Sequence, residues 1–166
     1  MVDSPESLKE FRRKYNFLDD VKVRYCPKSV AILSRGKGKV VIPLVAIIEG
    51  GVRIPMSDLL TNFLRHFKVC PNQCTPNVFS IVNSVDTLNK KLGLKLTKHN
   101  INYVYSFQDN KTSKYYFKIR HREVRLISGL PSSDKETEGD YLIVSRNWYP
   151  SGIHCPTSTG KAGGLA

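Results

Sequence analysis

The chain has 166 residues, of which 40% are hydrophobic, and it contains seven Phe, eight Tyr and one Trp. A chain of this length and composition can bury a core of its own, which excludes intrinsic disorder over most of its length. Its 26 Lys and Arg residues outnumber its 14 Asp and Glu residues, so the formal charge at pH 7 is +12 and a polyanion is the first partner to consider.

The cysteines and the N-terminal segment indicate the compartment. Four scattered cysteines, Cys26, Cys70, Cys74 and Cys155, are too few for a disulfide framework. The segment MVDSPESLKEFRRKY lacks the apolar core of a secretory signal. The longest apolar run, residues 40–48, is about half the length of a membrane span. We therefore expect an intracellular protein of the nucleus or cytoplasm, with reduced thiols and no membrane partner.

The first 48 residues are predicted to form one short helix and two extended segments. Ser4 and Pro5 are typical of a helix N-terminus, and apolar side chains then recur at helical spacing. Farther along, an apolar β-branched run contains Pro43, which cannot donate a hydrogen bond within a sheet. The expected elements are a helix over 5–16, a strand over 21–25, a basic turn over 35–39, and an edge strand or extended segment over 40–48.

Three further helices are predicted in the middle of the chain. Each begins near Ser, Thr or Pro, the residue types that favour a helix N-terminus, and each carries a periodic apolar stripe. The second of them ends at Gly93, which suits the left-handed position after a helix. The three helices are expected over 55–67, 75–93 and 97 to about 107.

The last third of the chain is predicted to be mainly β. Residues 108–114, QDNKTSK, are a turn by composition, and in residues 115–120 Tyr115, Phe117 and Ile119 alternate with lysine and arginine. Because Val124 and Leu126 continue this alternation, we expect a hairpin that turns around His121. Two further segments are expected, a loop over 129–133 and a short strand over 141–144.

Together these elements predict an α+β fold. We expect a small single domain over residues 1–150, in which three to four helices pack on a short antiparallel sheet or hairpin. Residues 151–166 contain almost no apolar side chains and are expected to form a disordered, flexible tail.

Basic residues are concentrated over residues 90–125. This segment has ten basic residues against two acidic ones, so it holds two thirds of the excess positive charge. Basic residues attract phosphates and exposed aromatic rings stack on bases, which makes nucleic acid the favoured ligand. The interleaved aromatic side chains are expected to face inward and to leave a basic face outside. The candidate nucleic-acid-binding residues are Lys90, Lys91, Lys95, Lys98, Lys114, Lys118, Arg120, Arg122 and Arg125.

The sequence lacks the patterns of a metal site or a catalytic site. Cys70 and Cys74 have no two further ligands at zinc spacing, so we predict no metal and no cofactor. The segment TSTGK lacks the spacing of a phosphate-binding loop. A metal-dependent strand-transfer enzyme needs converging carboxylates. Glu49, Glu123 and Asp140 are not placed for that by the predicted elements, and no catalytic residue is predicted.

Short motifs follow one another over residues 51–146, namely IPMSDLLTNFLRHF, CPNQCTPN, KKLGL, KYYFKIR and GLPSS. In this order they resemble the N-terminal domain of plant gypsy-type transposon proteins. The chain has Asp134 where the family has asparagine, and ETEGDYLIV where the family has an aromatic-rich continuation. The residues that match the family motifs are Pro71, Gln73, Pro76, Asn77, Gly129, Leu130, Pro131, Ser132, Ser133 and Lys135.

The resemblance implies a plant retrotransposon origin and a longer parent protein, and it implies no known reaction. The leading hypothesis is a non-catalytic, retroelement-derived module that binds nucleic acid through a basic face. The alternative is a gag-like assembly module, which pairs with copies of itself or with another element protein. A metal-dependent strand-transfer enzyme is the third and least favoured hypothesis.

Overall fold

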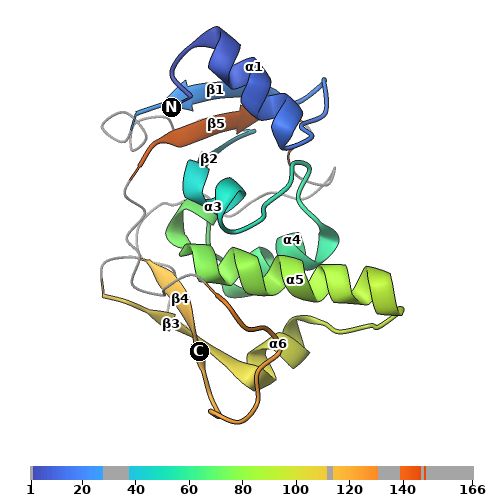
Figure 1. Ribbon diagram of the computed structural model, residues 1–166. Helices are drawn as coiled ribbons and strands as arrows, with labels where there is room; N and C mark the ends of the chain where they lie inside the picture. The colour runs from blue at the N-terminus through green and yellow to red at the C-terminus, as the bar shows by residue number, and fades with distance from the viewer. Residues whose placement is uncertain (1, 28–37, 112–113, 131–138, 147, 149–166) are drawn as a thin grey trace.

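In the part of the chain that the structure describes, two small antiparallel sheets are joined by helices (Figure 1). The computed structural model describes residues 2–27, 38–111, 114–130, 139–146 and 148. One sheet lies at one end of the molecule together with α1 (Pro5–Lys14), and a hairpin lies at the other end. Helices α4 (Asp58–Phe67) and α5 (Pro76–Leu92) lie between them. The predicted α+β class is confirmed.

The larger sheet has its last strand in the centre. Its three strands are β1 (Lys22–Cys26), β2 (Lys39–Pro43) and β5 (Tyr141–Ser145), in the order β1-β5-β2, and β5 is antiparallel to both neighbours. Leu142 and Val144 belong to the main core, whereas Tyr141 and Ile143 pack in a second cluster with Cys26. The short strand predicted near the end of the chain is therefore confirmed, and it is buried on both faces.

The segment predicted as extended over 40–48 is only half extended. Strand β2 ends at Pro43, and Leu44–Ile48 form a short helix, α3. Pro43 accounts for the change from strand to helix. Its backbone is held in an extended conformation, and it lies directly before the first helical residue. Of the turn predicted over 35–39, residues 35–37 lie outside the described residues and Lys39 already belongs to β2.

A glycine lets α3 approach α5 closely. A Cβ atom on Gly50 would lie 2.5 Å from the carbonyl oxygen of Ala46 and 2.7 Å from the Cβ of Phe79. Both distances are shorter than real side chains tolerate, so only glycine fits between the end of α3 and α5.

The predicted helix termini of α1, α4 and α5 agree with the structure to within a few residues. The Ser4 and Ser57 hydroxyls accept hydrogen bonds from the first turns of α1 and α4. Gly93 adopts the left-handed conformation after α5, with φ of 63°. A short 3-10 turn, η1 (Pro71–Gln73), connects α4 to α5.

The second sheet is a hairpin with a different partner from the one predicted. Helix α6 (Lys98–Val104) ends earlier than expected, and β3 (Tyr105–Asp109) pairs with β4 (Tyr115–Ile119). The expected hairpin around His121 is wrong, since residues 121–126 form no strand. The pairing that forms brings Phe107 opposite Phe117, and the ring centroid of Phe63 lies 5.2 Å from each of them. Burial of these aromatic rings favours β3 over a longer helix.

Two further sequence expectations concern the tail and a membrane span. The tail predicted over 151–166 lies outside the described residues. Within the described parts of the chain, no helix combines the length and the hydropathy that crossing a bilayer requires.

Candidate nucleic-acid interface

Strand β4 separates aromatic from basic side chains onto two faces. Tyr115 and Phe117 are buried and face the helices, as the alternation predicts. Lys118 is exposed on the other face, where the Tyr116 hydroxyl donates to Gln108 Oε1 at 3.1 Å. The prediction that the interleaved aromatic side chains face inward is confirmed for Tyr115 and Phe117 and is wrong for Tyr103, which is exposed on α6. The outer face of the hairpin presents Lys118 to solvent.

Arg120 ties the end of β4 to the end of α6. Its Nε donates to the carbonyl oxygens of Asn102 at 2.8 Å and Tyr105 at 3.3 Å, and its backbone N–H donates to Val104. These bonds satisfy carbonyls at the C-terminal end of a helix, where a positive charge is also favourable. Arg120 is exposed, so its charge is held at a fixed place on the surface.

Two histidines and a lysine meet where α4 lies against α6. The ring centroids of His66 and His99 are 5.9 Å apart, and Lys98 precedes His99 in the first turn of α6. His66 is exposed but partly desolvated by its neighbours, which lowers its pKa, and the nearby charges of Lys98 and His99 lower it further. No sequence pattern indicates this group, because His66 and His99 are distant in the chain and meet only through the packing of α4 against α6.

The remaining predicted cations differ in how free they are to bind a ligand. Lys90 forms an ion pair with Asp86 at 2.7 Å, and Lys114 donates through Nζ to the carbonyl of Asn72. The others are exposed and form no ion pair with another described residue; they are Lys91, Lys95, Lys118, Arg122 and Arg125. Lys98 is half-buried and likewise has no ion pair with a described acid.

The turn motif CPNQCTPN fixes α5 to the hairpin. Asn77 is buried, its Nδ2 donates to the carbonyl of Phe117 at 3.0 Å, and its Oδ1 accepts from the Phe117 N–H at 3.4 Å. The Thr75 N–H donates to the Tyr115 carbonyl at 2.9 Å. Gln73 Oε1 accepts from the Cys70 N–H at 2.9 Å and closes the turn. These contacts give the motif a structural role.

Of the other residues that match the family motifs, some lie within the described part of the chain. Pro71 and Pro76 are buried in the first turns of η1 and α5. Gly129 has a φ of 70°, a conformation that favours glycine, and Leu130 packs against the core. The rest of the GLPSS loop and its lysine lie outside the described residues; these are Pro131, Ser132, Ser133 and Lys135.

The buried cysteines are poorly suited to metal binding. Cys70 and Cys74 are both buried, and the Cys74 thiol donates to the Cys70 carbonyl at 3.8 Å. Burial raises the pKa of Cys74 far above its usual range, which opposes formation of the thiolate that a metal requires. Within the described residues, no group of three or more His, Cys, Asp and Glu side chains is arranged to hold a metal ion.

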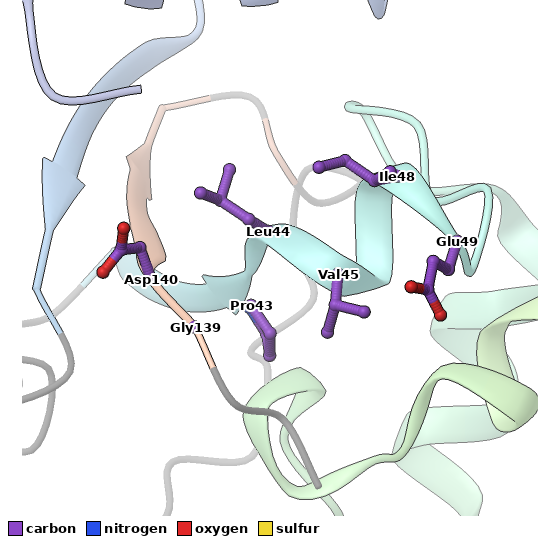
Figure 2. Close-up of a pocket in the computed structure, with 7 residues that line it drawn as sticks. All are labelled: Pro43, Leu44, Val45, Ile48, Glu49, Gly139 and Asp140. Atoms are coloured by element: carbon purple, nitrogen blue, oxygen red, sulfur yellow. The ribbon is translucent and has the colours of Figure 1, made fainter. Parts of the chain in front are cut away.

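A cavity of about 270 Å³ lies between α3 and the residues before β5 (Figure 2). Leu44, Val45 and Ile48 line it with apolar surface, and the carboxylates of Glu49 and Asp140 lie at its two ends. A hydrogen bond to Asp140 raises the pKa of the Tyr25 hydroxyl. Carboxylates repel phosphate, so this cavity does not suit a polyanion.

Comparisons with protein-family models, with curated proteins and with solved structures found no match to this chain. The resemblance to plant gypsy-type transposon proteins therefore rests on the short motifs alone.

Proposed function

We propose that this chain is a plant retrotransposon-derived, gypsy-type module that binds nucleic acid without catalysing a reaction. The motif order over residues 51–146 supports the origin. The observation that carries the binding proposal is the set of cations around β4 and α6. Lys98, Lys118 and Arg122 have no ion pair with a described acid, so their charge is available to an anionic polymer. The proposed site of action is the nucleus or the cytoplasm.

Binding would follow from counterion release. A nucleic-acid backbone carries condensed cations, and lysine or arginine side chains that contact its phosphates release them into solution. The outer face of the hairpin supplies Lys118, and the segment after β4 supplies Arg122 and Arg125, all of them exposed. Such contacts read the backbone and carry no sequence information, so the proposal is for binding without base specificity.

A salt titration tests the proposal. We expect the affinity for DNA and RNA to fall linearly with salt on logarithmic axes, with a slope of about −0.9 for each phosphate contacted in duplex DNA. The double variant Lys118→Glu with Arg122→Glu should lower the affinity at low salt by about tenfold or more. Arg120 is left unchanged because its side chain holds α6 to β4.

The matched control makes an equal change in net charge at the other end of the molecule. Lys9 and Arg13 are exposed on α1, so Lys9→Glu with Arg13→Glu alters the net charge equally. This control should lose much less affinity than the hairpin variant. Absence of binding at low salt would refute the proposed function, and an equal loss in both double variants would refute its location on the hairpin.

A further inference from the structure

Tyr103 is the most exposed large hydrophobic or aromatic side chain among the described residues, at 75% of its full accessible surface. The neighbouring tyrosine Tyr105 is buried. Tyr103 forms no side-chain hydrogen bond and no ring contact with another described residue, so its ring is open to solvent. A single exposed tyrosine is ordinary on a protein surface. Its surroundings are what distinguish this one.

Other flat rings lie close to Tyr103 along α6. His99 and Tyr103 are four residues apart in this helix, so their side chains are neighbours on one helical face. The His99 ring lies 5.9 Å from the ring of His66, which belongs to α4, and both histidines are exposed. Three planar side chains therefore follow one another across the surface, in the order His66, His99 and Tyr103.

Cations flank these rings at both ends. Lys98 lies beside the two histidines, and no described acid forms an ion pair with it. At the other end of α6, the carbonyls of Asn102 and Tyr105 hold the Arg120 side chain. Tyr103 lies between these two residues in the sequence. Exposed rings combined with flanking cations are the arrangement on which unpaired bases stack while their phosphates are neutralised.

We propose that His66, His99 and Tyr103 form a stacking platform for unpaired bases, so that the ligand is single-stranded nucleic acid. This inference rests on the proposed function and narrows its substrate class. In a duplex the base faces are covered by neighbouring base pairs, so they cannot stack on these rings. A single strand can place its bases on the rings and its phosphates near Lys98 and Arg120.

The test measures the affinity of the unlabelled protein for three labelled nucleic acids of the same length, namely oligo(dT), oligo(U) and a DNA duplex. The affinities are measured by fluorescence anisotropy at low salt. Tyr103→Ala should weaken binding to both single strands by about tenfold, since each stacked base contributes strongly to such complexes. Its affinity for the duplex should stay within about twofold, because the duplex is held by phosphate contacts. Tyr103→Phe keeps the ring and should bind single strands as the unaltered chain does.

Leu92→Ala is the matched control for loss of an exposed apolar side chain. Leu92 is 65% exposed and lies at the end of α5, outside the ring platform. It should leave all affinities unchanged, and circular dichroism should show the same fold for each variant. If Tyr103→Ala binds single strands as tightly as the unaltered chain does, or loses duplex affinity equally, the stacking inference is wrong while the proposed function stands. If no nucleic acid binds, both proposals fail.

Discussion

His66 shows how a tertiary contact changes the chemistry of one side chain. Its pKa lies below the ordinary value of 6.5, first because packing partly desolvates the ring and then because of the charges of Lys98 and His99. The folded chain therefore binds a proton at this position less readily than the unfolded chain does. The contribution of His66 to the free energy of unfolding is therefore present above pH 6.5 and decreases as the pH falls below that value, until the folded form is protonated as well.

Replacing His66 with glutamine should make the stability of the chain less sensitive to acid. The imidazole of His66 takes up a proton more readily in the unfolded chain than in the folded chain, and the variant lacks it. The variant should therefore lose less stability than the unaltered chain between about pH 7 and about pH 5. Urea unfolding followed by circular dichroism at both pH values measures the difference. His121→Gln, in the exposed segment after β4, is the control and should keep the original dependence. Identical pH dependence in His66→Gln and the unaltered chain would contradict the assigned environment.

For single residues, the sequence predicts which way a side chain faces better than it predicts which other side chains it contacts. The two-residue period of β4 correctly placed Tyr115 and Phe117 inward and Lys118 outward. It could not place His66 beside His99, because that contact depends on how α4 packs against α6. For the same reason it gave Arg120 as a ligand-binding cation without its bonds to α6.

The junction between α5 and β4 depends on one amide. Asn77 is 4% exposed and is hydrogen-bonded to both backbone groups of Phe117, the residue at the middle of β4. Since β4 is paired with β3 on its other side, Asn77 joins the helical layer to the whole hairpin. Loss of the amide would leave a buried N–H and a buried carbonyl without partners.

Asn77→Ala should therefore destabilise the fold by about 2–4 kcal/mol, from two buried groups at about 1–2 kcal/mol each. The measurement is the urea midpoint, which should fall while the slope of the transition stays the same. Asn62→Ala is the control, because Asn62 is exposed on α4 and alanine favours a helix. An unchanged midpoint in Asn77→Ala would show that the junction does not depend on this amide.

Helices with terminal signals and several turns were predicted well, whereas α3 and the boundary between α6 and β3 were not. Helices α4 and α5 have a cap or a terminal glycine and several turns of periodic apolar residues. Helix α3 has five apolar residues and no capping side chain, so its sequence resembles a continued strand. In β3, Tyr105 continues the apolar stripe of α6 as well as it fits a strand, and only the packing of Phe107 on Phe63 and Phe117 decides between them.

On the scale of the molecule, the order of the larger sheet is the feature least accessible from sequence. Strand β5 pairs with β1 and β2, whose residues lie about a hundred positions earlier; Val144, for example, is opposite both Val23 and Val40. The alternating pattern predicts that such strands exist and gives no information on their partners. Burial of both faces of β5 explains its continuous apolar sequence, which is typical of a central strand.

The distribution of apolar surface predicts that the chain is a monomer. The exposed large aliphatic side chains of the described residues lie in separate parts of the fold, except for the neighbours Leu92 and Leu94; the others are Leu18, Ile48 and Val124. Scattered side chains of this kind do not form the wide apolar patch that stable association needs. The formal charge of +12 also makes copies of the chain repel one another.

Sedimentation equilibrium should accordingly give the monomer mass of 18.8 kDa over a wide concentration range. The measurement is made at about 0.5 M salt, where the Debye length is only a few ångströms and charge repulsion cannot mask association. Leu92 and Leu94 are near neighbours at the end of α5, so Leu94→Asp is the matched variant for an apolar contact there. A mass that rises with concentration and returns to the monomer value in Leu94→Asp would favour the gag-like assembly module. A monomer in both proteins would count against assembly and leave nucleic-acid binding as the better account of this surface.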